Sequence, residues 1–227
     1  MPHTTKQRLP SPARLRNVLW LGGSPCAGKT SVARILAELY ALPVVHTDES
    51  FNAHRERFDL QHHPTLCKWT RNPWDDLWNQ PADVLLQENI AGYAEHFLLI
   101  LEDLLAAEPQ GAVLVEGSSL LPGSVAPWLA KPRQAIWFAA SEAFQRTHYP
   151  HRGTWVEAIL QQCQVPEDAF ARWMDRDVAF ARWVAGETER LGLEMIWVEG
   201  QYSIADNAAR VAQHMRLARR GRDAQSR

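Results

Sequence analysis

The sequence predicts an α/β fold built on a parallel five-stranded sheet, because short apolar runs alternate with segments of helical periodicity. The predicted strands cover residues 18–21, 44–46, 112–115, 134–138 and 194–198. A glycine-rich loop directly follows the first strand, and acidic residues follow the second and the third. Ligands of such sheets bind beyond the carboxyl ends of the strands, so these residues are predicted to lie together.

Helices are predicted where apolar residues recur at intervals of three or four. The predicted helices cover residues 29–41, 82–107, 166–191 and 204–215. Pro43 ends the first helix, Pro166 opens the third, and Gly192 follows it. Ser203 and Asp206 have the spacing of a capping box at the start of the last helix.

A chain of 227 residues is long enough for one large domain with an inserted segment. We predict a flexible N-terminus at residues 1–16, a folded domain at 17–217 and a flexible tail at 218–227. A transit peptide is the alternative for residues 1–16, although prolines there disfavour an amphipathic helix.

Two segments of the domain are predicted to serve the site: one binds an acceptor and the other forms a lid. Residues 49–80 are polar, rich in His and Trp and interrupted by prolines, which indicates short helices and loops inserted to bind an acceptor. Residues 141–165 carry arginines and histidines around Pro150 and Gly153, as in a mobile basic lid.

Composition and charge narrow the classes of partner. The formal net charge of −2 at pH 7 predicts no broad attraction for nucleic acid or for an anionic membrane. No apolar run approaches the roughly 18 residues of a membrane span. The cysteines Cys26, Cys67 and Cys163 are odd in number and widely spaced, which disfavours a disulfide framework. We therefore expect a cytoplasmic protein whose anion sites are local.

The loop Gly23-Ser-Pro-Cys-Ala-Gly-Lys-Thr30 fits the phosphate-binding pattern G-x-x-x-x-G-K-[ST] between a strand and a helix. Its backbone N–H groups are expected to converge on a polyphosphate at the positive end of the following helix. Lys29 is expected to reach the terminal phosphates, and the Thr30 hydroxyl to bind Mg²⁺. A glycine-rich turn with an incidental lysine is the alternative. The residues predicted to bind the nucleotide are Gly23, Ser24, Cys26, Ala27, Gly28, Lys29, Thr30 and Ser31.

Two acidic residues follow predicted strands. Asp48 is predicted to accept the proton of an attacking hydroxyl or to bind the acceptor. The alternative is that Asp48 or Thr47 caps the next helix. Glu116 is predicted to hold Mg²⁺ directly or through water, and an acid exposed at a strand end is the alternative.

Cationic and aromatic residues supply further candidates. A transferred phosphoryl group spreads negative charge, which arginines of the lid and the following helix are expected to stabilise. The candidates are Arg146, Arg152, Arg172 and Arg176, with surface arginines paired to nearby acids as the alternative for each. Cationic groups around Cys26 favour its thiolate.

The insertion contains tryptophans and histidines that have two interpretations each. Trp69, Trp74 and Trp78 either line an acceptor pocket or belong to the core. The spacing of the histidines and the cysteine in this segment fits no standard zinc pattern, so no metal cluster is predicted there. These residues are His54, His62, His63 and Cys67.

These features together resemble the P-loop small-molecule kinases, which include uridine kinase-like, nucleoside monophosphate kinase-like, zeta-toxin and chloramphenicol phosphotransferase-like enzymes. The resemblance covers residues 17–217, and it rests on the glycine-rich loop, Asp48, Glu116-Gly-Ser-Ser-Leu-Leu-Pro122, the arginine-bearing lid, and Val198-Glu-Gly200 with Ser203. It implies a three-layer P-loop NTPase fold with strand order 2-3-1-4-5, a helical lid, and a nucleotide base near residues 200–202. Residues 49–80 lack the monophosphate-binding signature of adenylate kinases.

The resemblance implies an ATP- and Mg²⁺-dependent kinase that phosphorylates a hydroxyl of a small molecule, as a monomer or homodimer. The Arg176-Asp177 pair resembles the phosphate-binding arginine of these kinases. The predicted catalytic residues are Lys29, Asp48, Arg146 and Arg176, and the predicted metal ligands are Thr30 and Glu116. A nucleoside or nucleotide acceptor is the second hypothesis, and a nucleotide-binding ATPase or switch without an acceptor is the third. No nucleic acid or membrane partner is expected.

Overall fold

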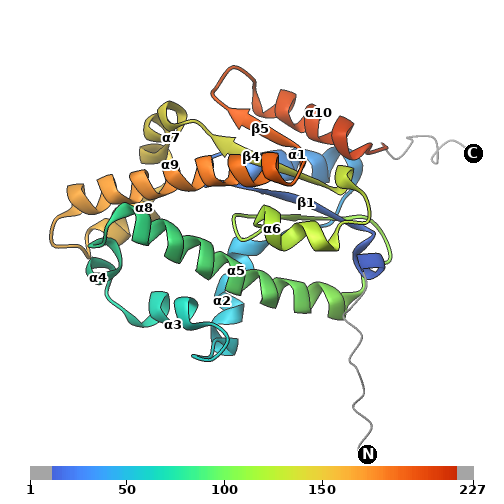
Figure 1. Cartoon of the computed structure of the whole chain (residues 1–227). Helices are drawn as coiled ribbons and strands as arrows, with labels where there is room; N and C mark the ends of the chain where they lie inside the picture. The colour runs from blue at the N-terminus through green and yellow to red at the C-terminus, as the bar shows by residue number, and fades with distance from the viewer. Residues whose placement is uncertain (1–11, 219–227) are drawn as a thin grey trace, which may run out of the picture.

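The computed structural model describes residues 12–218 and has an α/β architecture around a five-stranded, entirely parallel sheet (Figure 1). The strands are β1 (Val18–Gly23), β2 (Val44–His46), β3 (Val113–Glu116), β4 (Ala135–Ala140) and β5 (Met195–Val198). Their order is β2-β3-β1-β4-β5, which confirms the predicted order. The chain leaves the carboxyl end of β1 toward β2, whereas it leaves the neighbouring strand β3 in the opposite direction toward β4. Sheets of this kind bind ligands at the point where the two directions diverge.

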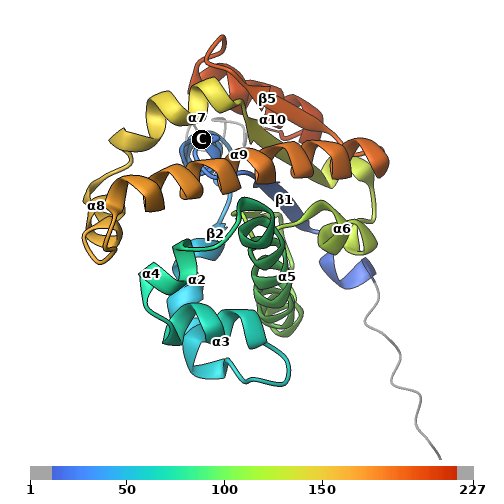
Figure 2. The ribbon, with the colours of Figure 1, turned by 60° about the vertical axis from the view of Figure 1, so that its left-hand side comes forward.

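Helices cover both faces of the sheet (Figures 1 and 2). The long helices are α1 (Lys29–Tyr40), α5 (Ala82–Ala107), α9 (Pro166–Arg190) and α10 (Ile204–Met215). Side chains alternate along each strand, so Trp20 packs with α5 and α9, whereas its neighbour Leu21 packs with α1 and α10. Each strand thus contributes to two apolar cores, one on each face.

Short helices surround the carboxyl edge of the sheet. They are α2 (Thr47–His54), η2 (Arg55–Arg57), α3 (Pro64–Arg71), α4 (Trp74–Trp78), α7 (Glu142–His148), η5 (Tyr149–His151) and α8 (Thr154–Leu160). In Figure 2, α2, α3 and α4 lie together beside α5, and α8 lies beside the beginning of α9. The rings of Trp78 and Trp173 stack with centroids 4.6 Å apart, so α4 and α9 share a third, smaller core. The remaining helical turns are η1 (Pro12–Leu15), α6 (Pro122–Val125), η3 (Ala126–Trp128) and η4 (Pro132–Gln134).

The predicted capping box and the predicted flexible ends can each be compared with the structure. Ser203 Oγ accepts a hydrogen bond from Asp206 N at 3.1 Å, and the Asp206 carboxylate accepts one from Ser203 N at 3.0 Å, so the capping box is confirmed. Residues 12–16, which belong to the predicted flexible N-terminus, contain η1, and Leu15 is buried in the core. Apart from residue 218, the other residues of the predicted flexible ends fall at 1–11 and 219–227, outside the described residues, as does most of the transit-peptide alternative.

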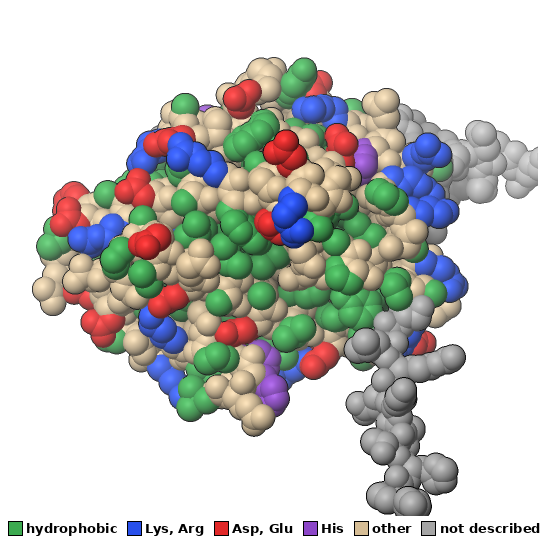
Figure 3. Space-filling view, in the orientation of Figure 1, with side chains coloured by type: hydrophobic (Ala, Val, Ile, Leu, Met, Phe, Trp, Pro, Cys, Tyr) green, Lys and Arg blue, Asp and Glu red, His purple; other side chains and the backbone are tan. Residues whose placement is uncertain are grey.

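The surface has mixed charge on the face shown in Figure 3. Acidic and basic side chains are interspersed there, and the described residues form no broad basic area on this face. Within residues 12–218, no helix combines the length and the apolar character needed to cross a bilayer.

Candidate active site

Residues 23–30, called the glycine loop below, connect β1 to α1. Ser24 ties this loop to β4, because its N–H donates to the Phe138 carbonyl at 2.8 Å and its Oγ accepts from Ala140 N at 3.0 Å. Gly28 precedes the first residue of α1 with φ of 79°, a conformation that residues with a β-carbon rarely adopt. The loop therefore has a defined backbone path that leads directly into the helix N-terminus.

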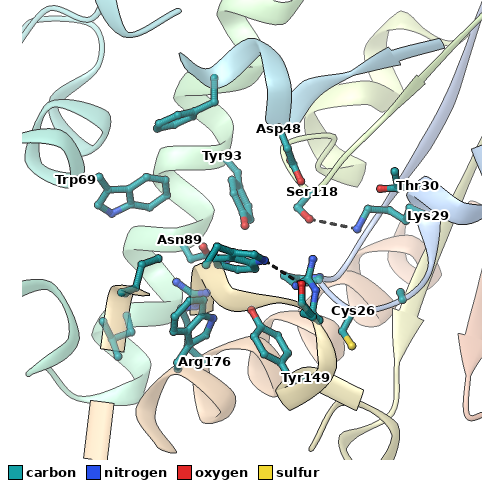
Figure 4. A pocket seen from close by; sticks show the side chains of 18 of the residues that line it. Cys26, Lys29, Thr30, Asp48, Trp69, Asn89, Tyr93, Ser118, Tyr149 and Arg176 are labelled. Atoms are coloured by element: carbon teal, nitrogen blue, oxygen red, sulfur yellow. Dashed lines mark hydrogen bonds between the residues drawn. The ribbon is translucent and has the colours of Figure 1, made fainter. Parts of the chain in front are cut away.

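Lys29 is the charged residue of the glycine loop, and it is buried. Its Nζ donates to the carbonyls of Gly23 at 3.0 Å and Ser24 at 2.7 Å, and to Ser118 Oγ at 3.2 Å. Burial lowers the pKa of Lys29, and the negative charges of Glu116 and Asp48 oppose that effect. The ammonium group therefore lies where the glycine loop, the segment after β3 and the start of α2 meet (Figure 4).

Glu116 ends β3 and lies against the beginning of α1. Its Oε1 accepts a hydrogen bond from Thr30 Oγ1 at 3.0 Å and lies 2.6 Å from His46 Nδ1. His46 is its register partner on the adjacent strand β2. Glu116 is only 4% exposed, so the alternative of an acid exposed at a strand end is wrong.

Asp48 lies in the first turn of α2 and faces the same pocket. The N-cap position of α2 belongs to His46, and no side chain makes a capping hydrogen bond there. The alternative in which Thr47 or Asp48 caps this helix is therefore wrong. Figure 4 shows the Asp48 carboxylate beside Ser118 and facing the side of Lys29.

One pocket of about 1030 Å³ extends from the glycine loop into a space between α3, α4, α5, α8 and α9. We call the inner part of this space the aromatic chamber, after its lining by Trp69, Trp74, Trp78, Tyr93, Tyr149 and Trp173. The predicted site residues that line the pocket are Cys26, Ala27, Gly28, Lys29, Thr30, Ser31, Asp48 and Arg176. Those that do not line it are Gly23, Ser24, Glu116 and Arg146, although Glu116 contacts Thr30 directly.

The lid arginines differ in their partners. Arg146 is exposed and pairs with Glu142 at 3.0 Å and with Asp175 at 2.8 Å, so the structure does not bring it to the glycine loop. Arg152 lines the pocket, with its guanidinium 5.0 Å from the centroid of the Tyr149 ring. Among the residues that the structure describes, Arg152 forms no ion pair. Its charge acts on Lys29 and Cys26 at the glycine loop.

Arg176 and Arg172 lie farther from the glycine loop on α9. Arg176 stacks over the Trp78 ring at 4.6 Å, and its Nε lies 2.9 Å from the carboxylate of the fully buried Asp177. Arg172 lines a separate cavity of about 100 Å³ instead of the main pocket.

Cys26 differs from its expected chemistry. Burial raises the pKa of the Cys26 thiol, and the opposing charges of Arg152 and Lys29 do not compensate. The neighbouring cations lower the pKa of Cys26, as expected, but burial outweighs them and favours the thiol. The three cysteines are all free; Cys26 is partly buried, and Cys67 and Cys163 are buried.

Three pocket residues escaped the sequence analysis. Ser118 follows Glu116-Gly117 and binds Lys29, which its place after a strand end could have indicated. Asn89 and Tyr93 lie four residues apart on one face of α5, and both line the pocket. Burial raises the pKa of Tyr93, whose hydroxyl shares a hydrogen bond with Ser118. No local signal distinguished Asn89, because the polar residues Gln87 and Glu88 precede it directly on α5.

The buried histidines form a hydrogen-bonded chain instead of a metal cluster. His96 Nδ1 lies 2.8 Å from Ser119 Oγ, and His96 Nε2 lies 3.1 Å from His54 Nδ1. His54 Nε2 continues the chain to Asp103 at 2.8 Å. In the described part of the chain, no three His, Cys, Asp or Glu side chains gather closely enough to hold a metal ion. This hydrogen-bonded chain of side chains connects α2, α5 and the segment after β3 that carries Ser118 and Ser119.

The comparisons with known proteins identify no family. The sequence matches no protein-family profile and no curated protein. A solved structure of an uncharacterised protein from Eubacterium ventriosum ATCC 27560 aligns with 88% of this chain and 98% of its own, with 13% identity and a TM-score of 0.45. A candidate kinase from Chloroflexus aurantiacus aligns with 87% of this chain and 98% of its own, with 13% identity and a TM-score of 0.43.

Proposed function

We propose that this protein is a Mg²⁺-dependent kinase that transfers the γ-phosphoryl group of ATP to a hydroxyl of a small molecule. The observation that supports this best is that one pocket is lined both by the glycine loop and by the aromatic chamber. Lys29 and Thr30 line one end, Asp48 lines the side, and the aromatic chamber forms the other end (Figure 4). Group transfer needs a donor site next to an acceptor site, whereas an ATPase without an acceptor needs only the first.

The residues around the glycine loop fit a Mg²⁺-bound triphosphate. Mg²⁺ prefers oxygen ligands, and Thr30 Oγ1 and Glu116 Oε1 are two such atoms 3.0 Å apart. Lys29 donates only to uncharged oxygens, which bind an ammonium group less strongly than phosphate oxygens do. Lys29 is therefore expected to exchange these partners for the terminal phosphates. When bound, Mg²⁺ would neutralise charge on the phosphate oxygens.

Asp48 would act on the acceptor. The acceptor oxygen forms a bond to the γ-phosphorus, the bond from that phosphorus to the ADP oxygen breaks, and the hydroxyl proton passes to the Asp48 carboxylate. Asp48 is a suitable proton acceptor because it lines the pocket beside Lys29 and Ser118 and caps no helix. It would also orient the hydroxyl before transfer.

We assign Arg152, in place of Arg146, as the lid arginine that stabilises the transferred phosphoryl group. Arg152 lines the pocket on the same side as the glycine loop, while two carboxylates already hold Arg146. A guanidinium without a carboxylate partner is free to bind the equatorial oxygens of the transferred group, where negative charge spreads.

The test measures ADP formation from Mg·ATP with and without a broad panel of hydroxyl compounds. We expect acceptor-dependent ADP formation in the wild type and none in Lys29→Met, because Lys29 would contact the transferred phosphate. Lys131→Met is the matched control, since Lys131 is exposed and precedes β4 at the amino edge of the sheet.

Two results would contradict the proposal. Equal ATP hydrolysis with and without every acceptor would favour an ATPase or switch, and undiminished turnover in Lys29→Met would contradict the assignment of the site to the glycine loop.

Asp48→Asn should lower kcat much more than it changes ATP affinity, and an unchanged kcat would exclude Asp48 as the base.

A further inference from the structure

One wall of the aromatic chamber is the Trp69 indole, which packs against a glycine in the middle of helix α5. Gly92 lies inside α5, where glycine is less favourable than alanine. A β-carbon at Gly92 would lie 2.2 Å from Trp69 Cη2, so only glycine lets the Trp69 indole lie against this helix. Trp69 also meets the Tyr93 ring edge-on at 6.1 Å between centroids. The Trp69 ring is thus fixed beside Tyr93 while it lines the pocket (Figure 4).

The lining of the chamber also contains buried donors without acceptors in the described part of the chain. Asn89 is 2% exposed, lines the pocket, and its Nδ2 has no partner among the described residues. Trp78 Nε1 and Trp173 Nε1 are likewise without partners in the part of the chain that the structure describes. Buried donors normally have acceptors, so this group of N–H donors requires an explanation. A ligand with an accepting oxygen or nitrogen would provide one.

The charges of the chamber are balanced within the protein. The Arg176 guanidinium donates a hydrogen bond from Nη2 to Asp177 Oδ1 at 2.6 Å. Glu88 pairs with Lys68, and Arg55 lies exposed at the rim of the pocket. Arg152, which contacts the Tyr149 ring, is assigned above to the transferred phosphate, and the charges deeper in the chamber are paired. The aromatic faces of the chamber therefore favour a flat apolar ring.

We infer that the phosphoryl acceptor contains a flat, uncharged aromatic ring with a hydrogen-bond-accepting oxygen or nitrogen, which Asn89 binds beside Trp69. This inference rests on the proposed function, because the hydroxyl of the acceptor must reach Asp48 while the ring lies in the chamber. Asn89 and Tyr93 are one turn apart on α5, so the ring would lie along the face of α5 that points toward Asp48 (Figure 4).

The experiment measures binding of three matched probes by ligand-observed NMR titration. The probes are 4-(hydroxymethyl)benzamide, its saturated analogue trans-4-(hydroxymethyl)cyclohexanecarboxamide, and benzyl alcohol, which lacks the accepting oxygen of the amide. We expect the benzamide to bind about three- to tenfold more tightly than either of the others, the range that one aromatic contact or one hydrogen bond provides.

Two asparagine variants separate a binding role from a structural one. Asn89→Leu should reduce benzamide affinity to that of benzyl alcohol and leave the thermal midpoint unchanged or higher, because it removes an unpaired buried donor. Asn207→Leu is the matched control, since Asn207 is equally buried but lies on α10 and accepts from Arg210. It should lower the thermal midpoint and leave the affinity for the benzamide unchanged.

Every other result overturns the inference. These results are equal or tighter binding of the saturated probe, no binding of the benzamide, unchanged affinity in Asn89→Leu, or a thermal midpoint lowered by that substitution. Binding of Mg·ATP and its loss in Lys29→Met are measured separately. ATP binding without ring preference would overturn only this inference. Ring preference without ATP binding would overturn the proposed function and would leave a ring-binding site that serves no phosphoryl acceptor.

Discussion

Gly92 and Trp69 are in direct contact, because the missing β-carbon of Gly92 would lie 2.2 Å from the indole ring. This contact joins α3 to the middle of α5 and sets the width of the pocket between them. It also makes the pocket sensitive to a single methyl group.

Gly92→Ala is expected to destabilise the protein by about 1–3 kcal/mol, because the methyl group must displace a large ring in a packed wall. Gly186→Ala is the matched change in α9, where a β-carbon meets no atom within 4 Å. It should stabilise by about 0.5–1 kcal/mol, since alanine favours a helix. Urea unfolding measures both. A destabilisation of equal size in the two variants would show that the Trp69 contact is not responsible.

Arg152→Ala should lower kcat by at least about 10²-fold, because it removes a cation that stabilises charge developed during transfer. Arg146→Ala should leave kcat within about twofold, because its exposed ion pairs contribute little to stability or to the site. Steady-state kinetics at saturating ATP distinguish the two arginines. The reverse ranking would return the catalytic role to Arg146.

Thr30→Val should raise the Mg²⁺ concentration for half-maximal activity by about 10- to 100-fold, because it removes a hydroxyl oxygen from the proposed metal site. Thr30→Ser keeps that oxygen and should retain most of the wild-type response. The measurement is a Mg²⁺ titration at fixed ATP. If valine and serine give the same Mg²⁺ midpoint, Thr30 does not bind the metal.

The stability of the fold should depend on pH through His96. Burial, and then the neighbouring His54, lower the pKa of His96 from its ordinary 6.5 to about 4. The unfolded chain therefore binds more protons between these values, so stability is greatest above pH 6.5 and falls toward pH 4. The difference corresponds to at most about 3 kcal/mol. Burial would raise the pKa of Asp103, but its hydrogen bonds with His54 and Arg57 hold that pKa below its usual range, outside this window.

Urea unfolding from pH 4.5 to pH 7.5 tests this dependence. His96→Gln should flatten the stability profile in that window, whereas His62→Gln, which changes an exposed histidine, should keep the wild-type slope. A profile that His96→Gln leaves unchanged would assign the pH dependence to other groups.

Most of the fold could be predicted from the sequence because its signals are local. The periodicity of residues 82–107 and the Ser203–Asp206 capping box depend on neighbours within a few positions, and both correspond to observed elements. Glu116 and Asp48 could be selected because the carboxyl ends of parallel strands share one edge. Their roles in catalysis stay predictions.

The parts that could not be predicted depend on partners far away in the sequence. Arg146 and Arg152 are six positions apart, and Asp175 on α9 is what holds Arg146 away from the pocket. Trp78 and Trp69 lie in the same Trp-rich insertion and have the same two interpretations from the sequence. In the structure Trp78 stacks on Trp173, whereas Trp69 lies against Gly92. No local pattern distinguishes such pairs, because packing between helices decides them.

The histidine chain has a consequence for how the helices align during folding. α5 carries leucines toward both of its ends and other apolar residues between them, so a slide of one turn would still bury apolar side chains. Such a slide would separate His96 from Ser119 and His54 and leave buried ring nitrogens unpaired, at about 1–3 kcal/mol for each. The polar chain therefore selects one register of α5, and that register is the one that sets Asn89 and Tyr93 along the pocket.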